Sequence, residues 1–205
     1  MNANVYDERT LPRPLPVGKA GHHTGGWWGM LALIGTETSV FAYLLFSYFY
    51  LQSQHAQTWP PTGLPPMRYS IPVTCCLIAS AGTMWWAEHS ARIGRRPFLL
   101  VALLVTLLLG VAYVVLQFLD WQIEPFTISS GAYASLFFLI TAAHVLHAIV
   151  GGFILIAMMM WSAMGHIAEQ RFGAINIAAM YWYFVVGIWI AVFITLYILP
   201  YIGPG

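Results

Sequence analysis

Charged side chains are scarce in this sequence. Only 7% of its 205 residues are Asp, Glu, Lys or Arg, whereas 60% are hydrophobic. A soluble domain carries about 25% charged residues, so this chain lacks the polar surface that would cover a soluble globule. Its formal net charge of +1 provides no basic surface of the kind that binds nucleic acid. The composition therefore predicts a membrane protein with no nucleic-acid partner.

Cysteine is scarce as well, and the two cysteines, Cys75 and Cys76, are neighbours near the start of an apolar run. Adjacent cysteines rarely pair with each other, so we expect two small buried apolar side chains without a redox role. The sequence also shows no internal repeat and no soluble domain. Residues 1–26 are polar and rich in Pro and Gly, and we expect a tail without a cleavable signal peptide.

Long apolar runs make up most of the remaining sequence. Each is long enough to cross about 30 Å of hydrocarbon as a helix, which takes about 20 residues. The runs cover residues 27–52, 71–91, 97–119, 131–161 and 178–200. They predict an all-α, polytopic bundle of five membrane-spanning helices, which forms a single transmembrane domain over residues 27–205.

Basic residues give the expected orientation of this bundle. Lys and Arg lie in the tail, in the second connection with Arg92, Arg95 and Arg96, and in the fourth connection with Arg171. The opposite side carries only Arg68. Because connections on the cytoplasmic side are enriched in Lys and Arg, we expect a cytoplasmic N-terminus and a periplasmic C-terminus.

One carboxyl group lies deep in a predicted helix. Glu37 occupies the apolar segment "MLALIGTETSVFAYLLF", and its neighbours at helical spacing, such as Leu33 and Phe41, offer it no partner. Burial without a cation favours the neutral acid. We favour a neutral carboxyl that hydrogen-bonds to another helix and fixes packing. A role with lipid headgroups or protons in a larger complex is the second interpretation, and direct catalysis is the third.

The fourth predicted helix carries two histidines in "AAHVLHAIVGG". His144 and His147 are three residues apart and share a face, at a membrane depth similar to that of Glu37. We therefore expect a polar cluster of Glu37, His144 and His147, with a hydrogen bond from Glu37 to one histidine. A metal or haem site is the alternative. Carboxylate-bridged metal bundles use repeated Glu-x-x-His units, which this sequence lacks, so we favour packing histidines and predict no metal or catalytic residue.

The end of the second predicted helix, "WWAEHSARIGRR", is rich in charge. Glu88 and Arg92 are four residues apart and can form an ion pair at the membrane surface. The functional alternative is a cytoplasmic rim that binds a partner subunit or lipid headgroups. The candidate docking residues are Glu88, His89, Arg92, Arg95, Arg96 and Arg171.

Four segments follow one another without large gaps over residues 27–200. They are "WWGMLALIGTETSVFAYLLFSYFYL", "ASAGTMWWAEHSA", "EPFTISSGAYASLFFLITAAHVLHAIVGGFIL" and "YWYFVVGIWIAVFITLY". In this order they resemble the glutamate-bearing helix, the Trp-Ala-x-His-Ser helix end, the Pro-Phe-Thr-Ile loop with its His-x-x-His helix, and the closing helix of one family. That family is subunit III of the haem-copper oxidases, most closely cytochrome c oxidase subunit III. Five helices resemble its short bacterial form.

This resemblance implies a supporting role in an enzyme complex. In the family, subunit I holds the haems and the copper that reduce oxygen to water with proton pumping, and subunit II receives electrons from cytochrome c. Subunit III carries no redox centre, packs on subunit I and binds phospholipid. The resemblance thus implies that this chain binds subunits I and II and further small subunits. It implies that the chain supports proton uptake, oxygen access and the stability of the complex. It also implies a multi-pass protein of the bacterial inner membrane. By this resemblance, Glu37 occupies the position of the family's buried glutamate, and His144 and His147 occupy the positions of its His-x-x-His motif.

The closing helix departs from the family pattern. Tyr183 and Val186 stand where the family usually has His and Asp, and Asn176 lies near the position of a family glutamate. We expect these changes to remove a polar cluster from the fifth helix. A quinol oxidase and an accessory subunit of a nitric-oxide-reductase-like complex are the alternatives. A standalone transporter is disfavoured because the sequence shows no repeat.

Overall fold

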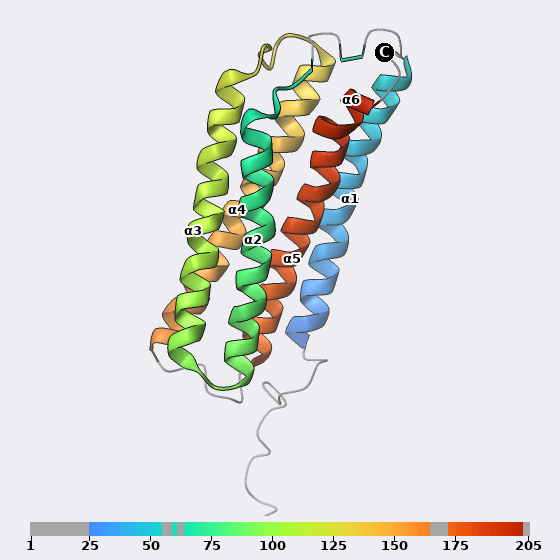
Figure 1. The fold of residues 1–205 in the computed structure, drawn as a ribbon. Coiled ribbons are helices and arrows are strands. Elements are labelled where there is room, and N and C mark those ends of the chain that lie inside the picture. The colour runs from blue at the N-terminus through green and yellow to red at the C-terminus, as the bar shows by residue number, and fades with distance from the viewer. Residues whose placement is uncertain (1–24, 55–58, 61–63, 165–171, 203–205) are drawn as a thin grey trace, which may run out of the picture.

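The computed structural model describes residues 25–54, 59–60, 64–164 and 172–202, and these form a bundle of long helices (Figure 1). The elements are α1 (Gly25–Gln54), α2 (Met67–Arg92), α3 (Arg96–Ile123), α4 (Ala132–Ala163), α5 (Phe172–Phe193), a π-helical turn (Ile194–Ile198) and α6 (Leu199–Ile202). The last three elements form one continuous rod, so five helices are long and apolar enough to cross a membrane. The expected all-α fold is confirmed, and the described residues contain no strand.

The helices extend beyond the apolar runs that predicted them. The second begins at Met67 instead of residue 71, the third ends at Ile123 instead of residue 119, and the fifth begins at Phe172 instead of residue 178. Backbone hydrogen bonds continue a helix past the point where its side chains become polar. One consequence is that the α3 helix includes Asp120, which lies just beyond the predicted run 97–119.

The α5 helix occupies the centre of the bundle. It packs against α1, α2 and α4, while α2 packs against α3 and α3 against α4. The α1 helix lies along one side (Figure 1), where Phe41 and Tyr48 are its buried residues. Most of the α1 surface is therefore left uncovered by the rest of the chain.

Trp182 of α5 fills the centre of the core and is almost fully buried. A Cβ atom added at Gly110 of α3 would lie 2.8 Å from its ring, and one added at Gly151 of α4 would lie 2.9 Å away. The indole N–H donates a 3.0 Å hydrogen bond to Ser80 Oγ of α2. Trp182 is thus a packing residue of the core, and so is Trp189, which is also fully buried.

The two cysteines differ in burial. Cys75 is exposed on the α2 surface and Cys76 is partly buried, and both are free thiols. The expectation that both are buried was therefore wrong for Cys75. Successive helical residues are about 100° apart around the axis, so neighbours in sequence face different surroundings.

Candidate functional site

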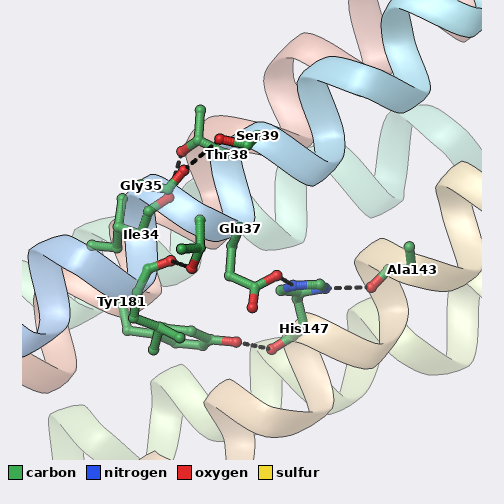
Figure 2. Close-up of polar contacts among 10 residues, drawn as sticks. Ile34, Gly35, Glu37, Thr38, Ser39, Ala143, His147 and Tyr181 are labelled. Carbon is green, nitrogen blue, oxygen red and sulfur yellow. Dashed lines mark hydrogen bonds and ion pairs between the residues drawn. The ribbon is translucent and has the colours of Figure 1, made fainter.

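A carboxyl–imidazole pair joins α1 to α4. Glu37 Oε2 lies 2.9 Å from Nε2 of His147 (Figure 2). The sequence-based prediction of a hydrogen bond from Glu37 to one of the two histidines is thus confirmed in this structure. The Glu37 side chain keeps 30% of its surface exposed and His147 keeps 15%, so the pair lies at the edge of the bundle.

The other nitrogen of His147 fixes how the pair holds its proton. His147 Nδ1 lies 2.7 Å from the carbonyl oxygen of Ala143, which can only accept a hydrogen bond. Nδ1 therefore carries hydrogen, and one further proton lies between Nε2 and Glu37. It belongs either to a neutral carboxylic acid that donates to imidazole or to an imidazolium that donates to a carboxylate. Either way, the pair is a two-position site for a single proton.

Aromatic side chains surround this pair on its inner side. The Phe41 ring packs edge-on at 5.0 Å from the His147 ring, and it is itself buried. The Tyr181 hydroxyl of α5 donates a 3.3 Å hydrogen bond to the His147 carbonyl (Figure 2). These contacts hold the imidazole in place and leave Glu37 as the more exposed member of the pair.

His144 makes its hydrogen bonds elsewhere, so of the expected three-residue cluster the structure joins only Glu37 and His147 by a hydrogen bond, although both imidazole rings pack on Phe41. His144 is fully buried, with Nδ1 2.7 Å from the Tyr113 hydroxyl and Nε2 2.9 Å from the Val185 carbonyl. In its neutral form Nε2 donates to the carbonyl and Nδ1 accepts from Tyr113. Residues three apart are about 60° apart around a helix, which turns His144 toward α3 and α5 and His147 toward α1.

Glu88 lies inside the bundle instead of on the expected outward rim. Its exposed fraction is 7%. Asn176 Nδ2 donates a 3.0 Å hydrogen bond to one carboxylate oxygen, and the Tyr183 hydroxyl donates a 2.8 Å bond to the other. These two donors occupy positions where the sequence departs from the family pattern. The structure thus shows a polar cluster of Glu88, Asn176 and Tyr183 between α2 and α5, in the region where the resemblance implied that the family's polar residues are lost.

Other candidate docking residues lie at the turn between α2 and α3. Arg96 Nε and one terminal nitrogen each donate a 2.6 Å hydrogen bond to the last carbonyls of α4, those of Ser162 and Ala163. A cation at this helix end is favourable, so Arg96 joins α3 to α4. His89 stacks on an α2 tryptophan, and Arg95 lies over the Phe98 ring. Arg92 is exposed here, and Arg171 lies outside the described residues.

A second buried polar cluster, which sequence reasoning missed, lies at the opposite end of the bundle. Asp120 is fully buried and accepts hydrogen bonds from Gln117 Nε2 and from the Tyr197 hydroxyl. The signal in the sequence was the spacing of Gln117 and Asp120, which are three apart and share a helix face. The predicted helix ended at residue 119, so this spacing was not considered.

Comparison with known proteins agrees with the motifs and the fold. The family model described as cytochrome c oxidase subunit III matches residues 19–201. The chain is 35% identical to cytochrome c oxidase subunit 3 of Formosania lacustris, 36% identical to that of Halichoerus grypus and 35% identical to that of Latimeria chalumnae. Each match spans 191 aligned positions, 86% of this chain and 72% of the relative. The chain therefore belongs to the cytochrome c oxidase subunit III family.

Proposed function

We propose that this chain is a non-catalytic supporting subunit of a respiratory haem-copper oxidase, which reduces oxygen with electrons from cytochrome c. In this proposal it packs on the subunit that holds the haems and copper, and it binds phospholipid. The observation that carries the proposal is the uncovered α1 surface onto which the Glu37–His147 pair opens. A membrane helix with so much free surface needs lipid or another subunit against it.

The α1 surface suits contact with acyl chains or apolar side chains. Tyr43 is 70% exposed and Phe46 is 65% exposed. The exposed hydroxyls of this helix are satisfied internally: Thr38 donates to the Ile34 carbonyl at 2.6 Å and Ser39 to the Gly35 carbonyl at 3.0 Å (Figure 2). Such groups need no outside partner, so the surface tolerates hydrocarbon.

The exposed proton-sharing pair supports a role in proton uptake by the complex. A carboxyl–imidazole pair of this kind is neutral while it holds the shared proton and carries one negative charge after releasing it, so it can take up and give back a single proton. We infer that the pair serves as a local proton reservoir for the neighbouring catalytic subunit. Lipid bound along α1 would then control the access of water to Glu37.

We infer a bacterial plasma membrane and a cytoplasmic N-terminus. The bias of Arg and Lys toward one side of the sequence supports this orientation, and the five-helix form supports the bacterial location. In this orientation Arg92 and Arg95 lie at the cytoplasmic surface, where anionic headgroups attract basic side chains. Single-cysteine labelling at the α2–α3 turn and at the α3–α4 loop of a cysteine-free chain tests the orientation. Accessibility of the α2–α3 turn from the periplasm would contradict it.

The proposal is tested first by its partners. An affinity tag on this chain should recover a membrane complex whose spectrum shows haem, and native mass spectrometry should find subunits I and II with bound phospholipid. Oxidation of cytochrome c by that complex would support the proposed electron donor. If the complex oxidises only quinol, the electron donor is quinol instead of cytochrome c. If it reduces nitric oxide, the reaction proposed here is wrong. Recovery of the chain without any haem-containing partner would overturn the proposal.

A second experiment tests the supporting role. Complex that lacks this chain should begin turnover near the normal rate and then lose activity faster than the complete complex. Adding the purified chain back in phospholipid should restore the longer working life. Loss of the first turnover would show that the chain takes part in the chemistry itself.

A further inference from the structure

The polar cluster around Asp120 lies where α3 ends and α4 begins, at the upper end of the bundle in Figure 1. Gln117 and Tyr197 both donate to Asp120 Oδ2. Tyr197 belongs to the π-helical turn Ile194–Ile198. Such turns are rare, and they occur often at functional sites. The chain thus uses an uncommon backbone conformation where it positions a hydroxyl against a buried carboxyl.

Several oxygens in this cluster have no hydrogen-bond partner although they are screened from solvent. They are Asp120 Oδ1, Gln117 Oε1, both carboxyl oxygens of Glu124, and the Tyr133 hydroxyl. Among the described residues, nearly all buried side-chain atoms without a partner lie at this end of the bundle, and Ser162 Oγ at the other end is the exception. Buried polar groups almost always have a partner, so a concentration of open positions indicates that a ligand belongs here.

The geometry restricts what this ligand is. The open atoms are screened from solvent, so a side chain of a partner subunit does not reach them. The contacts that the described residues make to Asp120 come from an amide and a phenol. No group of three His, Cys, Asp or Glu side chains among the described residues is placed to hold a metal ion. A small neutral ligand therefore fits this site better than a basic side chain or a coordinated metal.

The open groups also differ in kind. Gln117 Oε1 and Asp120 Oδ1 accept hydrogen bonds, whereas the Tyr133 hydroxyl also donates one. Gln117, Asp120 and Glu124 follow one another at three- and four-residue spacing at the end of α3, which places them on one helix face. The Tyr133 ring packs 5.4 Å from the ring of Phe126, two residues beyond Glu124, so the open atoms lie at the same end of the bundle. Water both donates and accepts, and an internal water usually makes about three hydrogen bonds to groups that would otherwise be unpaired. A cation would leave the hydroxyl proton of Tyr133 without an acceptor.

We propose that ordered water occupies this end of the bundle and bridges Glu124, Asp120, Gln117 and Tyr133. These four residues form the carboxyl–water site. Water accepts from the Tyr133 hydroxyl and from the hydroxyl of the neutral Glu124 carboxyl, and it donates to Asp120 Oδ1 and Gln117 Oε1. Tyr197 holds Asp120 in position from the π-helical turn. The site is separate from the Glu37–His147 pair and does not depend on the proposed function.

Replacement of Glu124 by methionine distinguishes a site that holds water (wet) from one that does not (dry), because the change in stability has opposite signs in the two cases. In a dry site, an apolar side chain of similar size relieves an unpaired carboxyl and leaves stability equal or higher. In a wet site, the change removes partners from bound water and lowers stability. We expect Glu124→Met to lower the midpoint for thermal loss of this subunit from the purified complex by about 2 °C or more. Exposed Gln122 is the matched control, and Gln122→Met should leave the midpoint unchanged.

Density in the intact complex provides the second test, which needs no variant. A cryo-EM map that resolves water should show at least one ordered water within 2.7–3.2 Å of two or more of the four residues, and Glu124→Gln should retain it. An unchanged or higher midpoint in Glu124→Met would overturn the proposal. So would an empty site, or density with oxygen ligands at about 2.3–2.6 Å that disappears on treatment with EDTA, because that would be a cation.

Discussion

His147 of α4 holds Glu37 of α1 through a 2.9 Å hydrogen bond, while its other ring nitrogen bonds its own helix. This arrangement makes one imidazole both a packing element and the partner of the acid on the most exposed helix. The structural role of Glu37 and the proton-related role proposed for it therefore depend on the same contact. Two kinds of variant are therefore needed. One removes the hydrogen bond that attaches α1 to α4, and the other keeps that bond but removes the exchangeable proton.

Glu37→Leu should weaken the attachment of α1 to the bundle. A polar contact between membrane helices contributes about 0.6 to 1.7 kcal/mol, and its loss leaves His147 Nε2 unpaired. Unfolding in mixed detergent micelles should show a reduction of that size. The double variant with His147→Leu should be less destabilised than the sum of the single variants, because the two residues form one interaction.

Glu37→Gln should keep the attachment and remove the exchangeable proton. An amide nitrogen can donate to His147 Nε2, so stability should stay near that of the wild type while steady-state proton uptake by the complex falls. Thr38→Val is the control, because its hydroxyl bonds only its own helix. Equal proton uptake in Glu37→Gln and wild-type complexes would contradict the proposed role.

Tyr183→Phe should destabilise the contact between α2 and α5. It leaves one oxygen of the buried Glu88 carboxyl without its donor, at a cost of about 1 to 3 kcal/mol. The exposed residue Tyr43 offers a matched control, and Tyr43→Phe should have no measurable effect on unfolding. Similar stability of the two variants would show that the Tyr183 bond contributes little.

Gly151→Ala should strain the centre of the core. The new Cβ would lie 2.9 Å from the Trp182 ring, and overpacking of this kind costs about 1 to 3 kcal/mol. Gly82→Ala is the control because no atom lies within 4 Å of its added Cβ. The double variant Gly151→Ala/Trp182→Leu should lose less unfolding free energy than the sum of the losses in the two single variants. If the losses are additive, contact with Trp182 is not the cause of the destabilisation.

Glu124 should make stability depend on pH. Burial, with a smaller effect of the Asp120 charge, raises the pKa of the Glu124 carboxyl from 4.5 to about 8. Between these values the carboxyl is neutral when folded and ionised when unfolded, so its contribution is complete below 4.5 and is lost as pH rises through 8. The thermal midpoint should fall over this window in the wild type, and Glu124→Gln should remove that part of the fall. Parallel pH profiles would contradict the prediction.

The sequence predicted the features that depend on helix period and membrane depth. Apolar runs predicted five helices, and the similar depths of Glu37, His144 and His147 predicted a hydrogen bond from Glu37 to one of the two histidines. Depth does not specify the rotation of a helix, so the separation of His144 from the Glu37–His147 pair was not predicted. Glu88 was interpreted from Arg92 in its own helix, whereas its donors come from α5. Asp120 was missed because a charged residue ends an apolar run before it ends a helix.

Trp182 has a consequence for how the bundle assembles. Its indole occupies the space left by Gly110 on α3 and Gly151 on α4, while its N–H bonds Ser80 on α2. The α5 helix leaves the ribosome after α2, α3 and α4, so this space has no side chain to fill it until α5 has been made. Translation that stops before α5 should therefore leave α2, α3 and α4 loosely packed and open to quality-control proteases, however well each is inserted.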